Sequence, residues 1–124
     1  MILNLTDLSS EPLQSQIYRQ IRAMILSGDL KAGAILPSIR GLARSEKVSV
    51  ITVQRGYEQL EKEGLIVSRR GKGFFVSDLH QNKRKELAEQ RLAEKLMPII
   101  KLAKNEGMMN FEIEAIIKKV ISNN

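Results

Sequence analysis

The hydrophobic pattern of this chain changes its period once, directly after Gly64, and this change constrains the fold more than any other feature. Before Gly64, apolar residues recur at the spacing of α-helices. After it stand two short runs, LIVSR (65–69) and GFFVS (73–77), which are rich in β-branched and aromatic residues. Two such runs around a glycine-containing turn predict a β-hairpin, with SRRGKGFFV (68–76) at its tip.

The first of three helices predicted before this hairpin begins near Glu11. Ser9 and Ser10 offer cap oxygens, and Pro12 suits the first helical position, where its missing N–H is no loss. Gly28 ends the apolar run, as glycine commonly does after a helix. The following segment, DLKAGAILP (29–37), is predicted to be a loop or a short strand.

Two shorter helices follow, over residues 38–46 and 49–63, and each begins at a serine with a capping side chain, Ser38 and Ser49. In the longer one, apolar residues at i, i+4 and i+7 define a single buried face. These residues are Val53, Tyr57 and Leu60. The order helix, helix, short break, helix, hairpin is the plan of a winged helix-turn-helix domain.

The remainder of the chain, from Asp78, is helical again by its pattern. It carries two apolar stripes at helical spacing. The first consists of Leu92, Leu96, Ile99, Ile100 and Ala103, and the second of Ile113, Ile116, Ile117, Val120 and Ile121. Pro98 should kink or break the first of these helices, and Asn110 is predicted to cap the second. About 45 residues cannot bury both stripes alone, so the tail needs either the first domain or a second copy of the chain.

We therefore predict an α+β, mostly α, protein made of two parts. Residues 1–77 form a winged helix-turn-helix domain, and residues 78–124 form a small helical tail that is a candidate for dimerisation. The tail has few polar residues that converge, so the sequence indicates no effector pocket.

The charge of the chain favours an anionic partner. The formal net charge is +6, and eight of the 20 lysine and arginine residues lie between Arg40 and Lys72. Such a surplus suits a nucleic acid, although many ordinary surfaces carry as much. The chain has no cysteine, which excludes disulfides and cysteine-bound zinc. No signal peptide or membrane span is visible, and we expect a cytoplasmic protein that binds no membrane.

An enzyme is the first alternative to a nucleic-acid-binding protein. The RGKG sequence lacks both the upstream glycine and the following Ser or Thr of a phosphate-binding P-loop. His80 is the only histidine, and no catalytic or metal-binding constellation is evident. We therefore expect no enzymatic activity, no metal and no cofactor. A second alternative is a winged helix that serves as a protein-interaction module without specific DNA reading.

One segment, residues 33–76, resembles the DNA-binding domain of the GntR family of bacterial transcription regulators. The resemblance rests on LPSIR (36–40), the VS-x-x-TV sequence at 48–53, the Y-x-x-L-x-x-x-G-L run at 57–65 and RGKGFFV (70–76). The short tail is similar to that of the YtrA-like subfamily. The resemblance implies a homodimeric regulator, more often a repressor, that binds double-stranded DNA at a palindromic operator and dimerises through its C-terminal helices.

The resemblance also implies roles for single residues. Arg40 contacts DNA, and Ser38 caps its helix and reaches a phosphate. Ser49 and Thr52 contact backbone or bases from the start of the third helix. Arg70 and Gly71, at the tip of the wing, enter the minor groove.

The sequence departs from the family pattern after Ser49, where Val50 replaces a residue that is often polar. Base reading could then rest on Ser49, Thr52, Gln54 and Arg55, with Val50 touching a thymine methyl group. Arg55 could equally pair with a carboxylate on its own helix. Arg44 suits a phosphate contact, as do Arg69 and Lys72, while Gly73, like Gly71, permits a tight turn close to a sugar-phosphate backbone.

Overall fold

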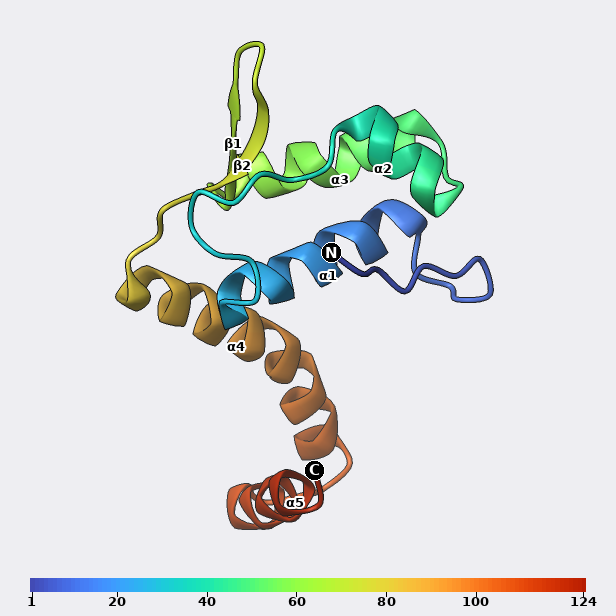
Figure 1. Ribbon diagram of the computed structural model, residues 1–124. Helices are drawn as coiled ribbons and strands as arrows, with labels where there is room; N and C mark the ends of the chain where they lie inside the picture. Colours follow the sequence, from blue (N-terminus) through green and yellow to red (C-terminus); the bar gives the residue numbers. More distant parts are fainter. The chain divides into compact units, whose positions relative to one another are not determined.

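The computed structural model describes residues 1–124 and divides into two compact units, Met1–Arg84 and Lys85–Asn124. The elements in chain order are α1 (Leu13–Ser27), α2 (Ile39–Glu46), α3 (Val50–Lys62), β1 (Ile66–Arg69), β2 (Gly73–Val76), α4 (Gln81–Asn105) and α5 (Asn110–Ser122) (Figure 1). The predicted fold class, mostly α with one antiparallel hairpin, is confirmed.

The core of the first unit forms where α1, α3 and the hairpin meet. The predicted face of α3 is fully buried, with Val53, Tyr57 and Leu60 at 0% exposure. Opposite it, α1 contributes Ile17, Ile21 and Ile25, each also fully buried. Side chains of this size stabilise the fold by about 1.5–3 kcal/mol each when they leave water, so this interface holds the unit together.

Two helix starts differ from the sequence predictions. α1 begins at Leu13 rather than near Glu11, and Pro12 occupies the cap position. The Ser9 hydroxyl instead accepts a hydrogen bond from the backbone N–H of Glu11, within the turn before the helix. α5 begins at Asn110 itself, so Asn110 is not the cap; the Glu112 carboxylate accepts from the N–H of Met109 at 2.9 Å.

Pro98 was predicted to kink or break its helix, and of these two effects the break is not observed. α4 continues through Pro98 to Asn105. The proline lies on the exposed side of the helix. The carbonyl group that it leaves without a donor can therefore be hydrated, which lowers the cost of an internal proline.

The hairpin consists of two short strands joined by a three-residue loop, as predicted. Ile66 pairs with Val76 and Arg69 with Gly73. A third segment adds to its free edge. Ile35 forms a bridge with Phe75, and the N–H of Leu36 donates to the Phe74 carbonyl at 2.9 Å. The segment before α2 therefore includes a short β-stretch, which ties α2 to the base of the hairpin.

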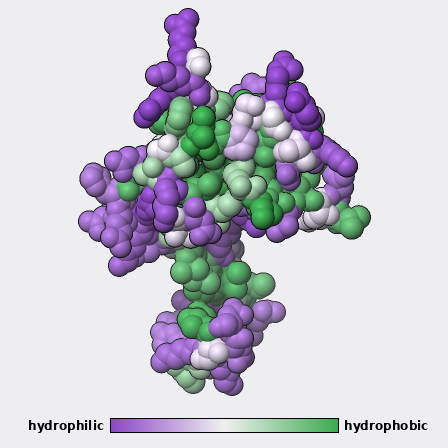
Figure 2. Space-filling model, in the orientation of Figure 1, coloured by the Kyte–Doolittle hydropathy of each residue, from purple (hydrophilic) through white to green (hydrophobic).

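The second unit consists of α5 and the larger part of α4, joined by a turn at Gly107, whose φ is +95°. Its helices leave most of their apolar side chains in contact with solvent. The exposed ones are Leu92, Met97, Ile99, Leu102, Met109, Phe111, Ile116, Val120 and Ile121. Between the two helices lies an apolar groove of about 120 Å³. Figure 2 shows apolar side chains gathered along the part of α4 that leads to α5.

Candidate nucleic-acid interface

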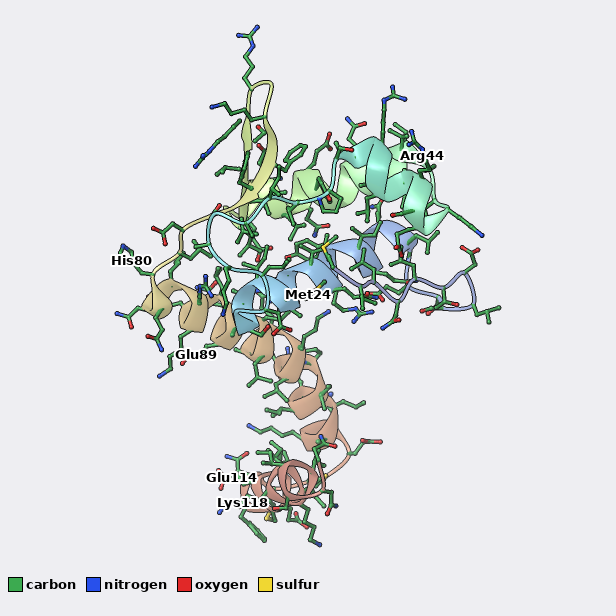
Figure 3. The ribbon with its side chains drawn as sticks, in the orientation of Figure 1. Met24, Arg44, His80, Glu89, Glu114 and Lys118 are labelled. Atoms are coloured by element: carbon green, nitrogen blue, oxygen red, sulfur yellow. The ribbon has the colours of Figure 1, made fainter.

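The first turn of α2 presents two arginines on the surface. The Ser38 hydroxyl accepts a hydrogen bond from the N–H of Gly41 at 2.9 Å, as the predicted cap requires. Leu42 and Ala43 face the core, so the opposite side of the helix carries Arg40 and Arg44 in solvent. Figure 3 shows Arg44 extending away from α2.

The turn between α2 and α3 is tight. Lys47 adopts a left-handed conformation with φ +57°, and the N–H of Val48 bonds to the Ala43 carbonyl at 3.0 Å. The Ser49 hydroxyl then caps α3 by accepting from the N–H of Thr52 at 3.1 Å. The two side-chain hydroxyl groups of Ser49 and Thr52 also share a hydrogen bond of 2.8 Å. Both predicted contact residues are thus held in place before any ligand binds.

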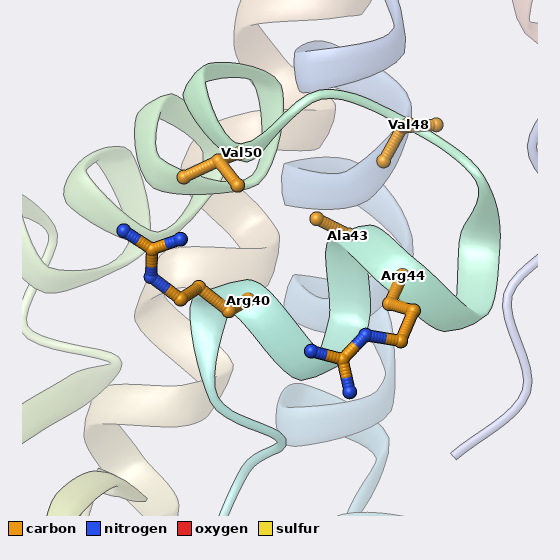
Figure 4. A pocket seen from close by; sticks show the side chains of 5 residues that line it. All are labelled: Arg40, Ala43, Arg44, Val48 and Val50. Atoms are coloured by element: carbon orange, nitrogen blue, oxygen red, sulfur yellow. The ribbon is translucent and has the colours of Figure 1, made fainter.

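A shallow hollow of about 270 Å³ lies where α2 meets the start of α3. Figure 4 shows its lining: Arg40, Ala43 and Arg44 from α2, Val48 from the turn and Val50 from α3. The two guanidinium groups flank an apolar floor. Neither arginine forms an ion pair, so both are available to an anionic ligand.

The outward face of α3 carries the remaining predicted readers. The Gln54 amide donates to the Glu58 carboxylate at 3.1 Å, which holds its side chain along the helix. Arg55 is exposed and pairs with no carboxylate in the structure. Of the two predictions for Arg55, the carboxylate pair is therefore not observed.

One residue of this face was absent from the sequence-based candidates. Ile51 is 52% exposed and lies one helical turn before Arg55. The signal was available in the sequence, because Ile51 does not share the helical spacing of Val53, Tyr57 and Leu60 and so cannot lie on the buried face.

The tip of the hairpin brings Arg69, Arg70 and Lys72 together with two glycines. Gly71 and Gly73 have φ of +74° and +104°, which explains why the turn uses glycine at both positions. The Arg69 guanidinium lies 4.8 Å from the centre of the Phe75 ring, in a cation–π contact. The strand below is tied to α3, because the Ser68 hydroxyl donates to the Glu61 carboxylate at 3.0 Å. The basic tip is thus carried on an anchored hairpin.

Tyr57, a buried residue of α3, contacts both the segment before α2 and the hairpin. Its hydroxyl donates to the Pro37 carbonyl at 2.8 Å, and its ring meets Phe74 of β2 edge-to-face, with centres 5.1 Å apart. Burial raises the pKa of the Tyr57 phenol above its ordinary value, so the group stays protonated as a donor. The prediction that Tyr57 is a core residue is confirmed.

No three His, Cys, Asp or Glu side chains lie together in a way that could hold a metal ion. None of the helices has both the length and the apolar character that a membrane span requires. His80 is exposed just before α4 (Figure 3).

Comparison with known sequences gives one family. The model of the bacterial regulatory proteins of the gntR family matches residues 13–76. The uncharacterized HTH-type transcriptional regulator YhcF of Bacillus subtilis is 34% identical over 105 residues, which cover 85% of this chain and 86% of YhcF. The HTH-type transcriptional repressor YtrA of Bacillus subtilis is 40% identical over 70 residues, but these cover 56% of this chain and only 54% of YtrA. The match thus spans about half the length of that repressor.

Solved structures agree with this result. A GntR family transcriptional regulator from Listeria monocytogenes is similar over 90% of this chain and 96% of its own, with a TM-score of 0.73 and 32% identity. The DNA-binding domain of AraR in complex with operator ORR3 is similar over 61% of this chain and 95% of its own, with a TM-score of 0.50 and 28% identity. The winged helix-turn-helix fold predicted from the sequence is confirmed.

Proposed function

The chain belongs to the GntR family of bacterial regulatory proteins, and on this basis we propose that it represses transcription as a homodimer bound to a palindromic operator. Its relatives are helix-turn-helix transcription regulators and include repressors. The relative solved with its operator, AraR, supports duplex DNA as the ligand.

The observation that carries the proposal is the arrangement of unpaired cations around α3. Arg40 and Arg44 on α2, Arg55 on α3 and Arg70 at the hairpin tip are all exposed and form no ion pair. In Figure 1 the hairpin and α2 project to the same side of the first unit, with α3 between them. A surface of this kind suits a polyanion, because each cation can neutralise a phosphate and release a counterion.

In the proposed complex, α3 enters the major groove and the hairpin, as the wing, follows the adjacent minor groove. Arg40 reads bases, together with Ser49, Val50, Thr52, Gln54 and Arg55. Ser38, Arg44, Arg69 and Lys72 hold phosphates, and Arg70, Gly71 and Gly73 form the tip that approaches the minor groove.

Dimerisation is proposed to occur through residues 78–124. The second unit exposes many large apolar side chains, and exposed apolar surface of this extent commonly marks an interface. A two-fold dimer would place two α3 helices on half-sites about one helical turn apart, which accounts for a palindromic operator.

Selection of bound sequences from random DNA duplexes tests the proposal. We expect a palindromic motif, and binding that weakens steeply as salt concentration rises. Recovery of no motif, with no salt-dependent binding to duplex DNA, would favour the protein-interaction module instead.

A further inference from the structure

Two adjacent apolar side chains, Val50 and Ile51, stand exposed at the first turn of α3. Val50 is 38% and Ile51 52% exposed, although both are β-branched residues that would be expected to lie inside. The core face of the helix is already filled by Val53, Tyr57 and Leu60. The exposed parts of Val50 and Ile51 therefore take no part in the packing of the first unit.

The surroundings of the pair are cationic. Val50 shares the hollow with Arg40 and Arg44 (Figure 4), and Arg55 lies one turn after Ile51 on the same side of α3. None of these arginines pairs with a carboxylate. An apolar spot flanked by free cations fits a ligand that is anionic overall and carries an apolar group at the point of contact.

Duplex DNA offers one such group in the major groove. Of the atoms that base pairs display there, the C5 methyl group of thymine is the apolar one. We propose that Val50 and Ile51 determine specificity by packing against thymine methyl groups of each half-site, and thereby require thymine at these positions. The inference rests on the proposed DNA-binding function and adds to it the chemical group that is read.

Deoxyuridine in place of thymine isolates this contact, because it removes only the methyl group and keeps every hydrogen-bonding atom. Each thymine of a duplex obtained by selection is replaced in turn, and the affinity of the full-length protein is measured. We expect at least one position per half-site at which binding weakens about fourfold, the factor that corresponds to ~0.8 kcal/mol for one buried methyl group.

The protein variants assign the effect to the pair. Val50→Ala and Ile51→Ala, singly and together, should bind the thymine duplex more weakly, and the double variant should no longer distinguish thymine from uracil. Leu8→Ala is the matched control, since Leu8 is an apolar side chain of the same unit that is 97% exposed in the N-terminal segment. It should keep the full sensitivity to uracil. Equal melting temperatures of the variants would show that the fold is intact.

The outcomes separate this inference from the function on which it rests. If the selected duplex tolerates uracil at every position, DNA binding stands and the methyl contact is wrong; a partner protein then becomes the better explanation of the exposed pair. If uracil sensitivity persists in the double variant, another residue reads the methyl group. If no duplex is selected at all, the proposed function itself fails, and the inference with it.

Discussion

The hydroxyl group of Tyr57 lies 2.8 Å from the carbonyl oxygen of Pro37 and donates a hydrogen bond to it. This bond joins the middle of α3 to the residue directly before the cap of α2. The same side chain contacts Phe74 edge-to-face at the base of the hairpin. One buried residue thus sets the relative positions of the three parts that we propose to touch DNA.

Replacement of this hydroxyl should weaken specific binding more than non-specific binding. Tyr57→Phe keeps the ring and its contact with Phe74, but it leaves the Pro37 carbonyl without its donor. We expect the free energy of unfolding to fall by about 1 kcal/mol, the net value of a typical hydrogen bond. Operator affinity should fall further than affinity for random duplex, because α2 and α3 lose their fixed alignment.

Tyr18→Phe is the matched control for this effect. It removes another largely buried phenol hydroxyl, which donates to the Glu63 carboxylate at the far end of α3 from the interface. We expect a comparable loss of stability with an unchanged ratio of operator to random-duplex affinity. An equal drop in that ratio for both variants would mean that Tyr57 acts only through overall stability.

The buried phenol of Tyr57 also predicts a pH dependence at alkaline pH. Burial raises its pKa in the folded protein above the ordinary value of about 10. Above about pH 10 the unfolded chain loses the proton while the folded protein keeps it. The stability that Tyr57 contributes is therefore complete below pH 10 and declines as pH rises toward the folded pKa. Urea unfolding between pH 9 and 11 should show a steeper decline for the wild type than for Tyr57→Phe, and parallel curves would contradict the assignment.

Arg40 and Arg44 should respond differently to replacement by alanine, although they lie one turn apart on α2. If Arg40 reads a base, Arg40→Ala should weaken operator binding by about 1–3 kcal/mol and relax the specificity at one position. As a phosphate contact, Arg44 should weaken all sequences about equally and reduce the salt slope by about 1. Titrations of operator and random duplex at several salt concentrations distinguish the two roles; Arg40→Ala with unchanged operator affinity would remove Arg40 from the readers.

The elements of the first unit were predictable because their signals are local. The stripe of Val53, Tyr57 and Leu60 defines a buried helix face by spacing alone, and Ser38 and Ser49 are followed by the N–H groups that they cap. The hairpin follows from the change of period and from glycines that adopt positive φ. Each of these features depends on residues only a few positions apart.

The features that the sequence did not predict depend on contacts that fall outside the regular spacing of a helix or strand. The Gln16 side chain, 2% exposed, bonds with the backbone of Thr6 and Glu11 and so fixes the segment before α1. That segment therefore folds back on the helix, and α1 starts later than its serines suggested. The Tyr57–Pro37 bond and the β-bridge of Ile35 with Phe75 reach further, because each joins residues 20 or more positions apart. No helical or strand period contains such information.

The exposed apolar side chains of α5 offer a test of the proposed dimer. Ile121 is 68% exposed, on a helix that also exposes Phe111, Ile116 and Val120. If a second copy covers this face, Ile121→Glu would place a carboxylate in an apolar interface without a partner, which costs several kcal/mol. We expect this variant to sediment as a monomer at concentrations where the wild type is a dimer. Operator affinity should fall with it, because two linked half-site contacts become one.

Lys118→Glu provides the control, since it introduces the same carboxylate on the same helix at a polar, exposed position (Figure 3). It should remain dimeric and bind the operator with nearly wild-type affinity. Because Ile121 is 68% exposed and both positions lie outside the first unit, neither variant should lower the melting temperature of the first unit. A dimer that persists in Ile121→Glu, with operator binding unchanged, would place the interface outside this face of α5.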